Sequence, residues 1–447
     1  MQFLLRKTHL TMQSANAMGP MLNIIALFSI ISIFTGTFQP IIVLSAFLLS
    51  YLNIIAIYWL SRTFTSDGGY YTFAGKVFGP SAGTLTALLY ALYGLPVLLD
   101  LSLFVESISE QVVGGFSVPY PIIAMFVGLM FIVLSIFIIL TRERRSFAFT
   151  VAAGTFELTF IIITSMIFLI RGSDSISQAV SGFPGFSGTA QGLIFALLAF
   201  SGGGSSIFLS EKSRLPTNDP AKSIILSYTI VGLVLVLASF ALNGAFTNGA
   251  SSSSGTFQLI SVVFSDLGRR AALIFYLVAL LSALNLTTSY LRALMGFFRR
   301  ASIDNVMGMG TLANRKLAMS VYAAATFALY IEISLTTNTF LAFEIIAGLV
   351  SLSYIVVHII TNFSFLRLKV LKRSILYKTG SAASSVVLIL VLIGSISGNL
   401  SSVPQIDFLF AIGIAICGAI IFVVRAIRPS SIRGLMVWAL QDDLNDR

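Results

Sequence analysis

Long hydrophobic runs separated by short polar segments dominate this sequence. A helix needs about 20 apolar residues to cross a bilayer, and many of the runs reach that length. The pattern therefore predicts an all-α integral membrane protein with twelve membrane-spanning helices. We expect these helices at residues 11–36, 40–61, 82–109, 120–140, 147–170, 189–210, 222–243, 271–297, 316–333, 338–365, 380–398 and 405–426.

The basic residues indicate how the helices are oriented. Of the 27 lysines and arginines, 23 fall on the side that holds both termini, three fall on the other side, and Arg292 lies within a span. This bias follows the positive-inside rule, so both termini are expected in the cytoplasm of a cell-membrane protein. The net charge of +10 therefore reflects topology and does not point to a nucleic-acid partner. The longest outer loop, about 244–270, contains the flexible tract NGASSSSG. The tail is expected along the inner membrane surface, with Trp438 as an anchor.

Composition supports the membrane assignment and argues against catalysis. The chain of 447 residues is 57% hydrophobic and 10% charged, whereas soluble domains carry about 25% charged residues. Cys417 is the one cysteine, and two histidines are too few for a site of several His ligands. Neither a Gly-x-Ser-x-Gly elbow nor a Gly-Lys-Ser/Thr phosphate loop occurs. We therefore expect a protein that is not an enzyme and uses no metal or other cofactor.

Two of the predicted helices contain segments that should not remain helical. The first helix holds Gly19-Pro20, and proline both lacks an N–H group and displaces the carbonyl four residues earlier. The sixth holds the segment 201–205, Ser-Gly-Gly-Gly-Ser, in which each interior glycine costs about 1 kcal/mol relative to alanine. Non-helical backbone is tolerated at membrane depth where it lines a cavity. Close helix packing or a simple kink is the alternative explanation for either break alone.

The two breaks occupy matching positions on helices of opposite direction, about 185 residues apart with four complete spans between them. Such a pair is typical of an inverted repeat. We therefore expect a first repeat of helices 1–5 at residues 1–170 and a second of helices 6–10 at 171–366. Helices 11 and 12 then take residues 367–428, and residues 429–447 form a cytoplasmic tail.

Freed backbone groups at the breaks are the predicted substrate-binding groups. Freed N–H groups and half-helix ends bind a carboxylate, and freed C=O groups bind an ammonium or a cation. A zwitterionic amino acid presents both charges. Asp100, one turn after Pro96 in the third span, could meet a cationic group of the substrate or serve the local kink. The candidate substrate-binding residues are Ala15, Asn16, Ala17, Met18, Gly19, Asp100, Phe200, Ser201, Gly202, Gly203, Gly204 and Ser205.

Three stretches resemble the amino acid–polyamine–organocation (APC) superfamily of transporters, which has the LeuT-type fold. They are SANAMGPM in the first helix, LSRTFTSDGGYYTFAGKVFGP at residues 60–80, and AFSGGGSSIFLSEKSRLPTNDPAKSI from the sixth helix onward. With the span count, the resemblance covers roughly the whole chain. It implies a transporter whose substrate binds at the broken helices. The sequence departs from the family pattern at Gly203 and Gly204, where a bulky residue and often Glu usually stand. The resulting loss of side-chain volume favours a larger substrate.

Polar residues inside spans are candidates for ion or proton coupling, because charges are costly at the bilayer centre. Thr150, Gly154 and Glu157 share one face of the fifth span, which should point into the bundle. Burial disfavours the charged form of a carboxyl group, so Glu157 could carry the coupling proton. By the resemblance, Glu157 falls near a position where some proton-coupled relatives place a Lys in the place of a sodium ion. Glu157 could equally help to hold sodium, or form a structural hydrogen bond.

The eighth and tenth spans carry further polar stripes. In sodium-coupled relatives, adjacent hydroxyl residues on the eighth helix bind the ion, and Thr288 and Ser289 match them in type. The alternative is that these hydroxyl groups bond a backbone carbonyl. Arg292, on the same face, is expected to be an inner-gate or structural cation. His358 in the tenth span could relay protons, although a lone histidine usually serves packing.

Together these features predict a secondary active transporter of amino acids that works by alternating access, with proton coupling favoured over sodium. The alternatives are an amino acid or polyamine exchanger, a sodium-coupled symporter, or an amino-acid sensor that does not transport. The expected partners are a small amino acid substrate and the lipid bilayer, and the sequence leaves the oligomeric state open.

Overall fold

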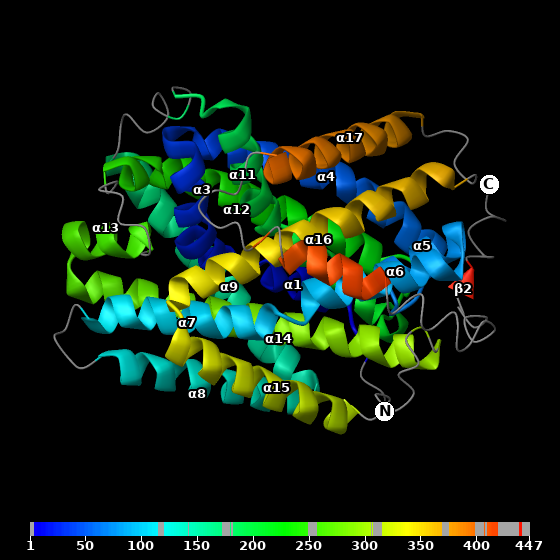
Figure 1. Ribbon diagram of the computed structural model, residues 1–447, viewed down its shortest axis with the longest axis horizontal. Coiled ribbons are helices and arrows are strands. Elements are labelled where there is room, and N and C mark those ends of the chain that lie inside the picture. The colour runs from blue at the N-terminus through cyan, green and yellow to red at the C-terminus, as the bar shows by residue number, and fades with distance from the viewer. Residues whose placement is uncertain are drawn as a thin grey trace.

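The computed structural model is described over residues 4–114, 120–141, 143–171, 179, 182–248, 257–304, 306, 315–368, 375–397, 406, 409–418 and 438–439. Helices make up nearly all of it (Figure 1). The first half comprises α1 (Lys7–Met18), α2 (Pro20–Leu22), the π-helix η1 (Asn23–Leu27), α3 (Phe28–Thr35), the 3₁₀-helix η2 (Gly36–Phe38), α4 (Gln39–Thr63), β1 (Phe64–Thr65), α5 (Tyr70–Phe78), α6 (Pro80–Gly94), α7 (Val97–Gly114), α8 (Tyr120–Leu140) and α9 (Glu143–Arg171). The second half comprises α11 (Gly185–Leu198), the 3₁₀-helix η3 (Ser201–Lys212), α12 (Asp219–Asn248), α13 (Gln258–Leu267), α14 (Arg269–Ile303), α15 (Arg315–Thr336), α16 (Thr339–Arg367), α17 (Ile375–Ser397) and β2 (Trp438–Ala439).

Helices stand where eleven of the twelve spans were predicted. Ten stretches of the described chain are long and apolar enough to cross a membrane, and the first of them, Lys7–Thr63, contains two predicted spans. The twelfth predicted span, 405–426, contains a described helix only at Leu409–Gly418, which is too short to cross. The structure therefore supports a multi-pass membrane protein, and the count of twelve helices stays a prediction, as do the repeat boundaries.

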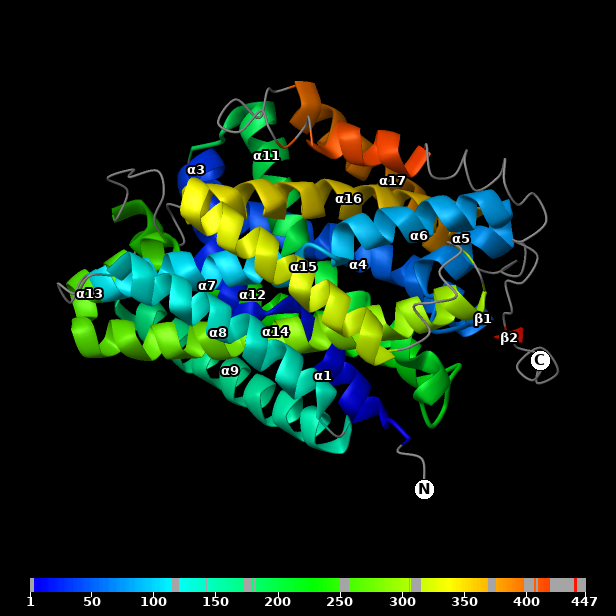
Figure 2. The ribbon, with the colours of Figure 1, turned by 60° about the horizontal axis from the view of Figure 1, so that its bottom comes forward.

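Burial separates central from peripheral helices. In the helix formed by α11 and η3, 94% of the most apolar stretch of 18 residues is buried, compared with 17% of the corresponding stretch in α15. Helices α8 and α15 lie at one edge of the bundle and α17 at the opposite edge (Figure 1). Helix α1 lies between them in Figure 1, and in Figure 2 its N-terminal end projects from the lower edge beside α9. Peripheral helices expose apolar side chains such as Ile122, Phe126 and Leu376, as expected for surfaces that face lipid.

Two connecting segments contain secondary structure that was not predicted, while the position of the tail along the membrane surface stays a prediction. The outer loop predicted at 244–270 contains a helix, α13, whose Leu259, Ile260 and Val263 are buried. Apolar residues at this spacing lie on one helix face, and the neighbouring polar tract concealed that signal; residues 249–256 of the tract lie outside the described residues. In the tail, β2 pairs antiparallel with β1, Thr65 opposite Trp438. The backbone of Trp438 is therefore part of a strand pair.

Candidate substrate and coupling site

The first predicted break is present, the second is a change of helix type, and the backbones of the two segments touch. Helix α1 ends at Met18, Gly19 is left-handed with φ of 56°, and Pro20 begins the next helical segment. The other helix, α11, ends at Leu198, and the 3₁₀-helix η3 begins at Ser201. Residues 201–205 keep helical backbone angles, so the prediction that they would not remain helical is wrong; glycine here permits a tighter helix and close packing. An ideal Cβ on Gly202 would lie 1.8 Å from the carbonyl oxygen of Ala17. Only glycine fits at 202, so part of the glycine run serves the close approach of the two breaks.

Hydrogen bonds hold the same two segments together. The Ser205 hydroxyl donates to the carbonyl of Gln13 at 3.2 Å, and the Ser206 N–H donates to Oγ of Ser14 at 3.2 Å. Both pairs are buried. The segments 13–19 and 201–206, nearly 190 residues apart in sequence, therefore form one continuous polar seam.

Glu157 accepts a hydrogen bond from an N–H group that has no helical partner because of the first break. Because Pro20 interrupts the helical hydrogen bonds, the first N–H groups beyond it need other partners. The N–H of Met21 donates to Oε1 of Glu157 at 2.8 Å, and the N–H of Leu22 donates to the hydroxyl of Ser282 at 3.1 Å. The Ser282 hydroxyl itself donates to the same Glu157 oxygen at 2.6 Å. A carboxyl group thus sits at the positive end of a half-helix, where negative charge is stabilised.

The second carboxyl oxygen of Glu157, Oε2, does not take part in these hydrogen bonds. Oε2 is buried and has no hydrogen-bond partner among the residues that the structure describes. The side chain of Asn285, which lies beside the carboxyl group, also has both amide atoms without such a partner. Thr150 and Gly154, predicted to share the inward face with Glu157, are buried as expected. One oxygen of Glu157 therefore organises the break, and the other is available to a proton or a ligand.

Asn23 binds the carbonyl groups that the two breaks free, a role that the sequence analysis missed. Its Nδ2 donates to the carbonyl of Met18 at 2.6 Å and to the carbonyl of Ala199 at 2.8 Å. These carbonyls belong to the ends of the two interrupted helices. The side-chain amide of Asn23 therefore satisfies two carbonyl oxygens that an ammonium group or a cation could otherwise bind. A buried asparagine three residues after the interrupting proline was the available signal.

Two tyrosines cover the start of η3, and the sequence analysis missed these as well. The hydroxyl of Tyr93 donates to the carbonyl of Ser201 at 2.8 Å and contacts the hydroxyl of Tyr290. The Ser201 hydroxyl lies 3.1 Å from the hydroxyl of Tyr290. Tyr93 comes from α6 and Tyr290 from α14, so the third and eighth spans both reach the second break.

The space beside Gly203 and Gly204 is filled, which corrects the prediction that it accommodates a larger substrate. An ideal Cβ on Gly203 would lie 1.9 Å from the ring of Tyr228, and one on Gly204 would lie 2.1 Å from the hydroxyl of Tyr70. Aromatic rings from α12 and α5 thus take the volume that side chains at 203 and 204 would need. Gly203 and Gly204 face protein, and the volume argument for substrate size is wrong.

A polar column continues from Glu157 along the facing sides of α1, α9 and α14. Thr288 donates to the carbonyl of Leu284 at 2.7 Å, the structural bond that was the alternative for this residue. The Ser289 hydroxyl is buried and has no partner in the described part of the chain. Farther along, Arg292 donates to the side chain of Gln13 and to the Ser146 hydroxyl, the latter at 2.7 Å. Arg292 therefore joins all three helices.

Two other candidates form no hydrogen bond to either break among the described residues. The Asp100 side chain on α7 is buried, and its Oδ1 has no hydrogen-bond partner among the described residues. His358 on α16 is buried between rings, with centroids 5.4 Å from Tyr70 and 4.0 Å from Tyr354. Neither nitrogen of His358 has a partner among the described residues. Its contacts are those of a packing residue.

Where η3 and α14 end, an ion-pair network joins them to the β1–α5 loop. Arg299 donates to Asp67 at 2.8 Å and to Glu211 at 3.1 Å. The N–H of Glu211 donates to Asp67 at 2.8 Å, and the N–H of Asp67 donates to Glu211 at 3.2 Å. Burial, followed by the nearby Glu211 carboxylate, raises the pKa of Asp67 to about 7. This network connects the broken helix to the loop that the sequence analysis related to a transporter family.

Comparison with known proteins places the chain in a family. Residues 14–421 match the family described as "Amino acid permease". The chain belongs to the amino acid permease family. This family lies within the APC superfamily, as the sequence resemblance indicated, and its members are membrane transporters and not enzymes.

A solved structure shows the fold of this permease. The crystal structure of MhsT in complex with L-phenylalanine is similar, with a TM-score of 0.56 and 17% sequence identity. The match covers 86% of this chain and 98% of the MhsT chain. At that identity the likeness shows the LeuT-type fold alone. Among curated proteins, none matches the sequence closely enough to count as a relative.

Proposed function

We propose that this permease is a secondary active transporter that carries amino acids across the cell membrane together with protons. Transport occurs by alternating access around the two breaks, with both termini in the cytoplasm. The observation that carries the proposal is the position of Glu157, whose Oε1 receives the N–H of Met21 while its Oε2 has no partner in the described structure.

Glu157 can bind and release a proton without losing its hydrogen bonds. A proton on Oε2 leaves Oε1 free to accept from Met21 and Ser282. Hydrogen bonds to a charged group contribute about 1.5–3 kcal/mol, compared with about 0.5–1.5 kcal/mol for neutral pairs. Protonation therefore weakens the tie between α9 and the half-helix that begins at Pro20. A change in the charge of Glu157 therefore changes the strength of the hydrogen bonds that join α9 to the backbone just after the first break.

An amino acid suits the polar groups at the breaks. The carbonyls of Met18, Ala199 and Ser201 accept hydrogen bonds from Asn23 and Tyr93, and an α-ammonium group can replace these donors. N–H groups and hydroxyls of the seam 13–19 and 201–206 are suitable donors for the α-carboxylate. Membership of the amino acid permease family supports the same substrate class.

Uptake of radiolabelled amino acids into sodium-free proteoliposomes tests the proposal. With one proton per substrate, an inward gradient of one pH unit supports about tenfold accumulation, since a pH unit is worth 1.36 kcal/mol. We expect accumulation with the gradient and none without it. Accumulation that requires added sodium would instead make Glu157 and Ser289 candidate cation ligands and would refute proton symport.

Glu157→Gln separates coupling from substrate binding. Glutamine keeps an acceptor oxygen for Met21 and Ser282 but cannot carry the proton, so we expect no pH-driven accumulation and continued exchange of substrate. Glu344→Gln, the same change at another buried glutamate on α16, is the matched control and should accumulate normally. Unchanged accumulation by Glu157→Gln would remove Glu157 from the coupling mechanism.

A further inference from the structure

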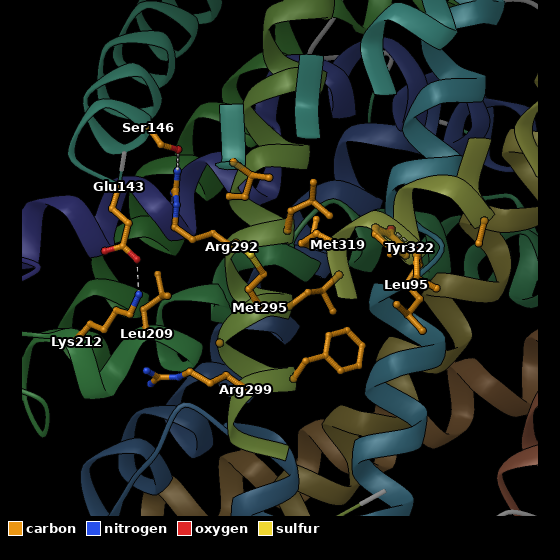
Figure 3. A pocket seen from close by; sticks show the side chains of 17 residues that line it. Leu95, Glu143, Ser146, Leu209, Lys212, Arg292, Met295, Arg299, Met319 and Tyr322 are labelled. Atoms are coloured by element: carbon orange, nitrogen blue, oxygen red, sulfur yellow. Dashed lines mark hydrogen bonds and ion pairs between the residues drawn. The ribbon is translucent and has the colours of Figure 1, made fainter. Parts of the chain in front are cut away.

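A cavity of about 430 Å³ lies at the ends of η3, α9, α14 and α15, apart from the two breaks (Figure 3). No residue of the breaks lines it. Most of its wall is apolar and comes from α14 and α15, including Leu294, Met295, Phe298 and Met319. Pockets that hold small ligands have volumes of about 300–1,000 Å³, so this cavity can enclose a molecule of amino-acid size.

Charged groups of both signs gather at one side of the cavity. Lys212, at the end of η3, is paired with Glu143, at the start of α9, and these side chains are 30% and 34% exposed. Arg292 also lines the cavity and donates to the Ser146 hydroxyl beside it. In Figure 3 Glu143, Lys212, Arg292 and Arg299 all lie on one side, across from Met319 and Tyr322. The cavity thus has a charged side and an apolar side.

We propose that this cavity is a second amino-acid site, selective for zwitterions with an apolar side chain. The α-carboxylate binds Lys212 and Arg292, the α-ammonium group binds Glu143, and the side chain lies against Leu294 and Met295. The inference rests on the proposed function, because it gives the transported class of molecule a second place to bind.

The charge pattern favours a zwitterion over other occupants. An amino acid that enters between Lys212 and Glu143 exchanges one ion pair for two, so neither side chain is left unpaired. Because that pair is partly hydrated, separating it costs less than separating a buried pair. The lining holds three cations, Lys212, Arg292 and Arg299, and one carboxylate, Glu143. Arg299 is paired with Asp67 and Glu211 outside the cavity, so Lys212 and Arg292 are the cations assigned to the ligand's carboxylate. A purely anionic or purely cationic ligand would leave Glu143 or Lys212 without a partner.

Arg292 connects this cavity with the central site. Arg292 lines the cavity, and its guanidinium group reaches the seam of the first break through Gln13. Gln13 in turn donates to the carbonyl of Ser289 and accepts from the Ser205 hydroxyl at its own carbonyl. A substrate that leaves the breaks along the polar column therefore reaches the second site next.

Equilibrium binding of radiolabelled L-leucine to the purified full-length protein tests the proposal. We expect two molecules per chain. Met295→Trp, which fills the cavity, should bind one, and Gly202→Leu, which forces the breaks apart, should also bind one. Ile303→Trp, on an exposed position of the same helix outside the cavity, is the control and should bind two. Excess L-lysine or L-glutamate should compete at the second site at least tenfold more weakly than L-phenylalanine.

Glu143→Gln tests the chemistry independently of cavity shape. We expect it to weaken L-leucine binding at the second site at least tenfold and to strengthen binding of 4-methylpentanoate, which lacks the ammonium group and no longer leaves a carboxylate unpaired. Equal loss for both ligands would overturn the assigned role of Glu143.

The remaining outcomes separate failure of this inference from failure of the proposed function. One bound leucine per chain, abolished by Gly202→Leu and unaffected by Met295→Trp, overturns the second site and leaves amino-acid transport standing. Co-purified lipid that Met295→Trp excludes, together with one leucine per chain, assigns the cavity to lipid and also overturns the second site. No bound amino acid of any kind refutes the proposed function and the second site together.

Discussion

Replacing Gly202 with alanine should separate the two broken helices. The new Cβ would start 1.8 Å from the carbonyl oxygen of Ala17 and 2.8 Å from the N–H nitrogen of Met18, and contacts below 3.0 Å essentially do not occur. Both neighbours are backbone atoms, so no side-chain rotation relieves the clash. The segments must move apart by about 1.2 Å, the difference between 3.0 and 1.8 Å.

That displacement is large enough to break the hydrogen bonds across the seam. The bonds from Asn23 to Ala199, Ser205 to Gln13 and Ser206 to Ser14 measure 2.8, 3.2 and 3.2 Å, and each would stretch to about 4 Å, beyond hydrogen-bonding range. Each bond contributes about 1 kcal/mol, and overpacking adds about 1–3 kcal/mol. The total is about 4–6 kcal/mol, and 4 kcal/mol alone is about a thousandfold in an equilibrium constant.

Initial uptake rates in proteoliposomes, at matched protein content, measure this effect. We expect Gly202→Ala to transport at less than about 1% of the unaltered rate and to denature at a lower temperature in detergent. Gly380→Ala is the control, because its Cβ would meet only Leu52 at 3.4 Å, an ordinary contact. If Gly202→Ala transports and denatures like Gly380→Ala, the close approach of the two breaks is wrong.

Three further predictions concern neighbouring features. Gly203→Leu should abolish transport, because a Cβ at this position would lie 1.9 Å from the Tyr228 ring. Adding Tyr228→Ala should restore at least a tenth of the uptake. Failure of this rescue would show that the clash is with another residue. Asn23→Leu leaves the carbonyls of Met18 and Ala199 buried without a hydrogen bond, at a cost of about 1–3 kcal/mol each, so the melting temperature of the variant should fall. An unchanged melting temperature would contradict these two hydrogen bonds. With the pKa of Asp67 raised to about 7, the folded state binds more protons than the unfolded state between about pH 4 and 7. The free energy of unfolding should therefore decrease as pH rises through that window, by at most about 1.4 kcal/mol per pH unit. Melting curves of Asp67→Asn should lose this pH dependence. If the variant and the unaltered protein show the same pH profile, the raised pKa of Asp67 is refuted.

Much of the helical framework could be predicted from the sequence. Length and hydropathy of the runs located the helices, because a membrane span requires an unbroken apolar stretch whatever its neighbours are. Pro20 located the first break, and the glycine run located the change from α-helix to 3₁₀-helix, because a missing N–H group or side chain acts on the local backbone. α13 was missed because its amphipathic pattern covers only ten residues beside a polar tract.

The candidate site was only partly predictable. Glu157 was found because an acidic residue inside a span is costly and therefore informative. Asn23, Tyr93 and Tyr290 were missed because neutral polar residues on a helix carry no comparable signal. The space expected at Gly203 was assigned wrongly, because Tyr228 occupies it from a helix that sequence spacing does not relate to Gly203.

The sequence by itself determined that this chain crosses a membrane, where its helices are interrupted, and which carboxyl groups lie within the spans. The tertiary structure decided that Glu157, and not Asp100, binds the backbone of the first break. Only the tertiary structure decided which groups satisfy the opened backbone. Met21 and Glu157 are 136 residues apart, and Asn23 and Ala199 are 176 apart. The physical reason is that helix formation and helix breaking depend on neighbouring residues along the chain, whereas the partner of a freed backbone group is fixed by how separate helices pack against one another.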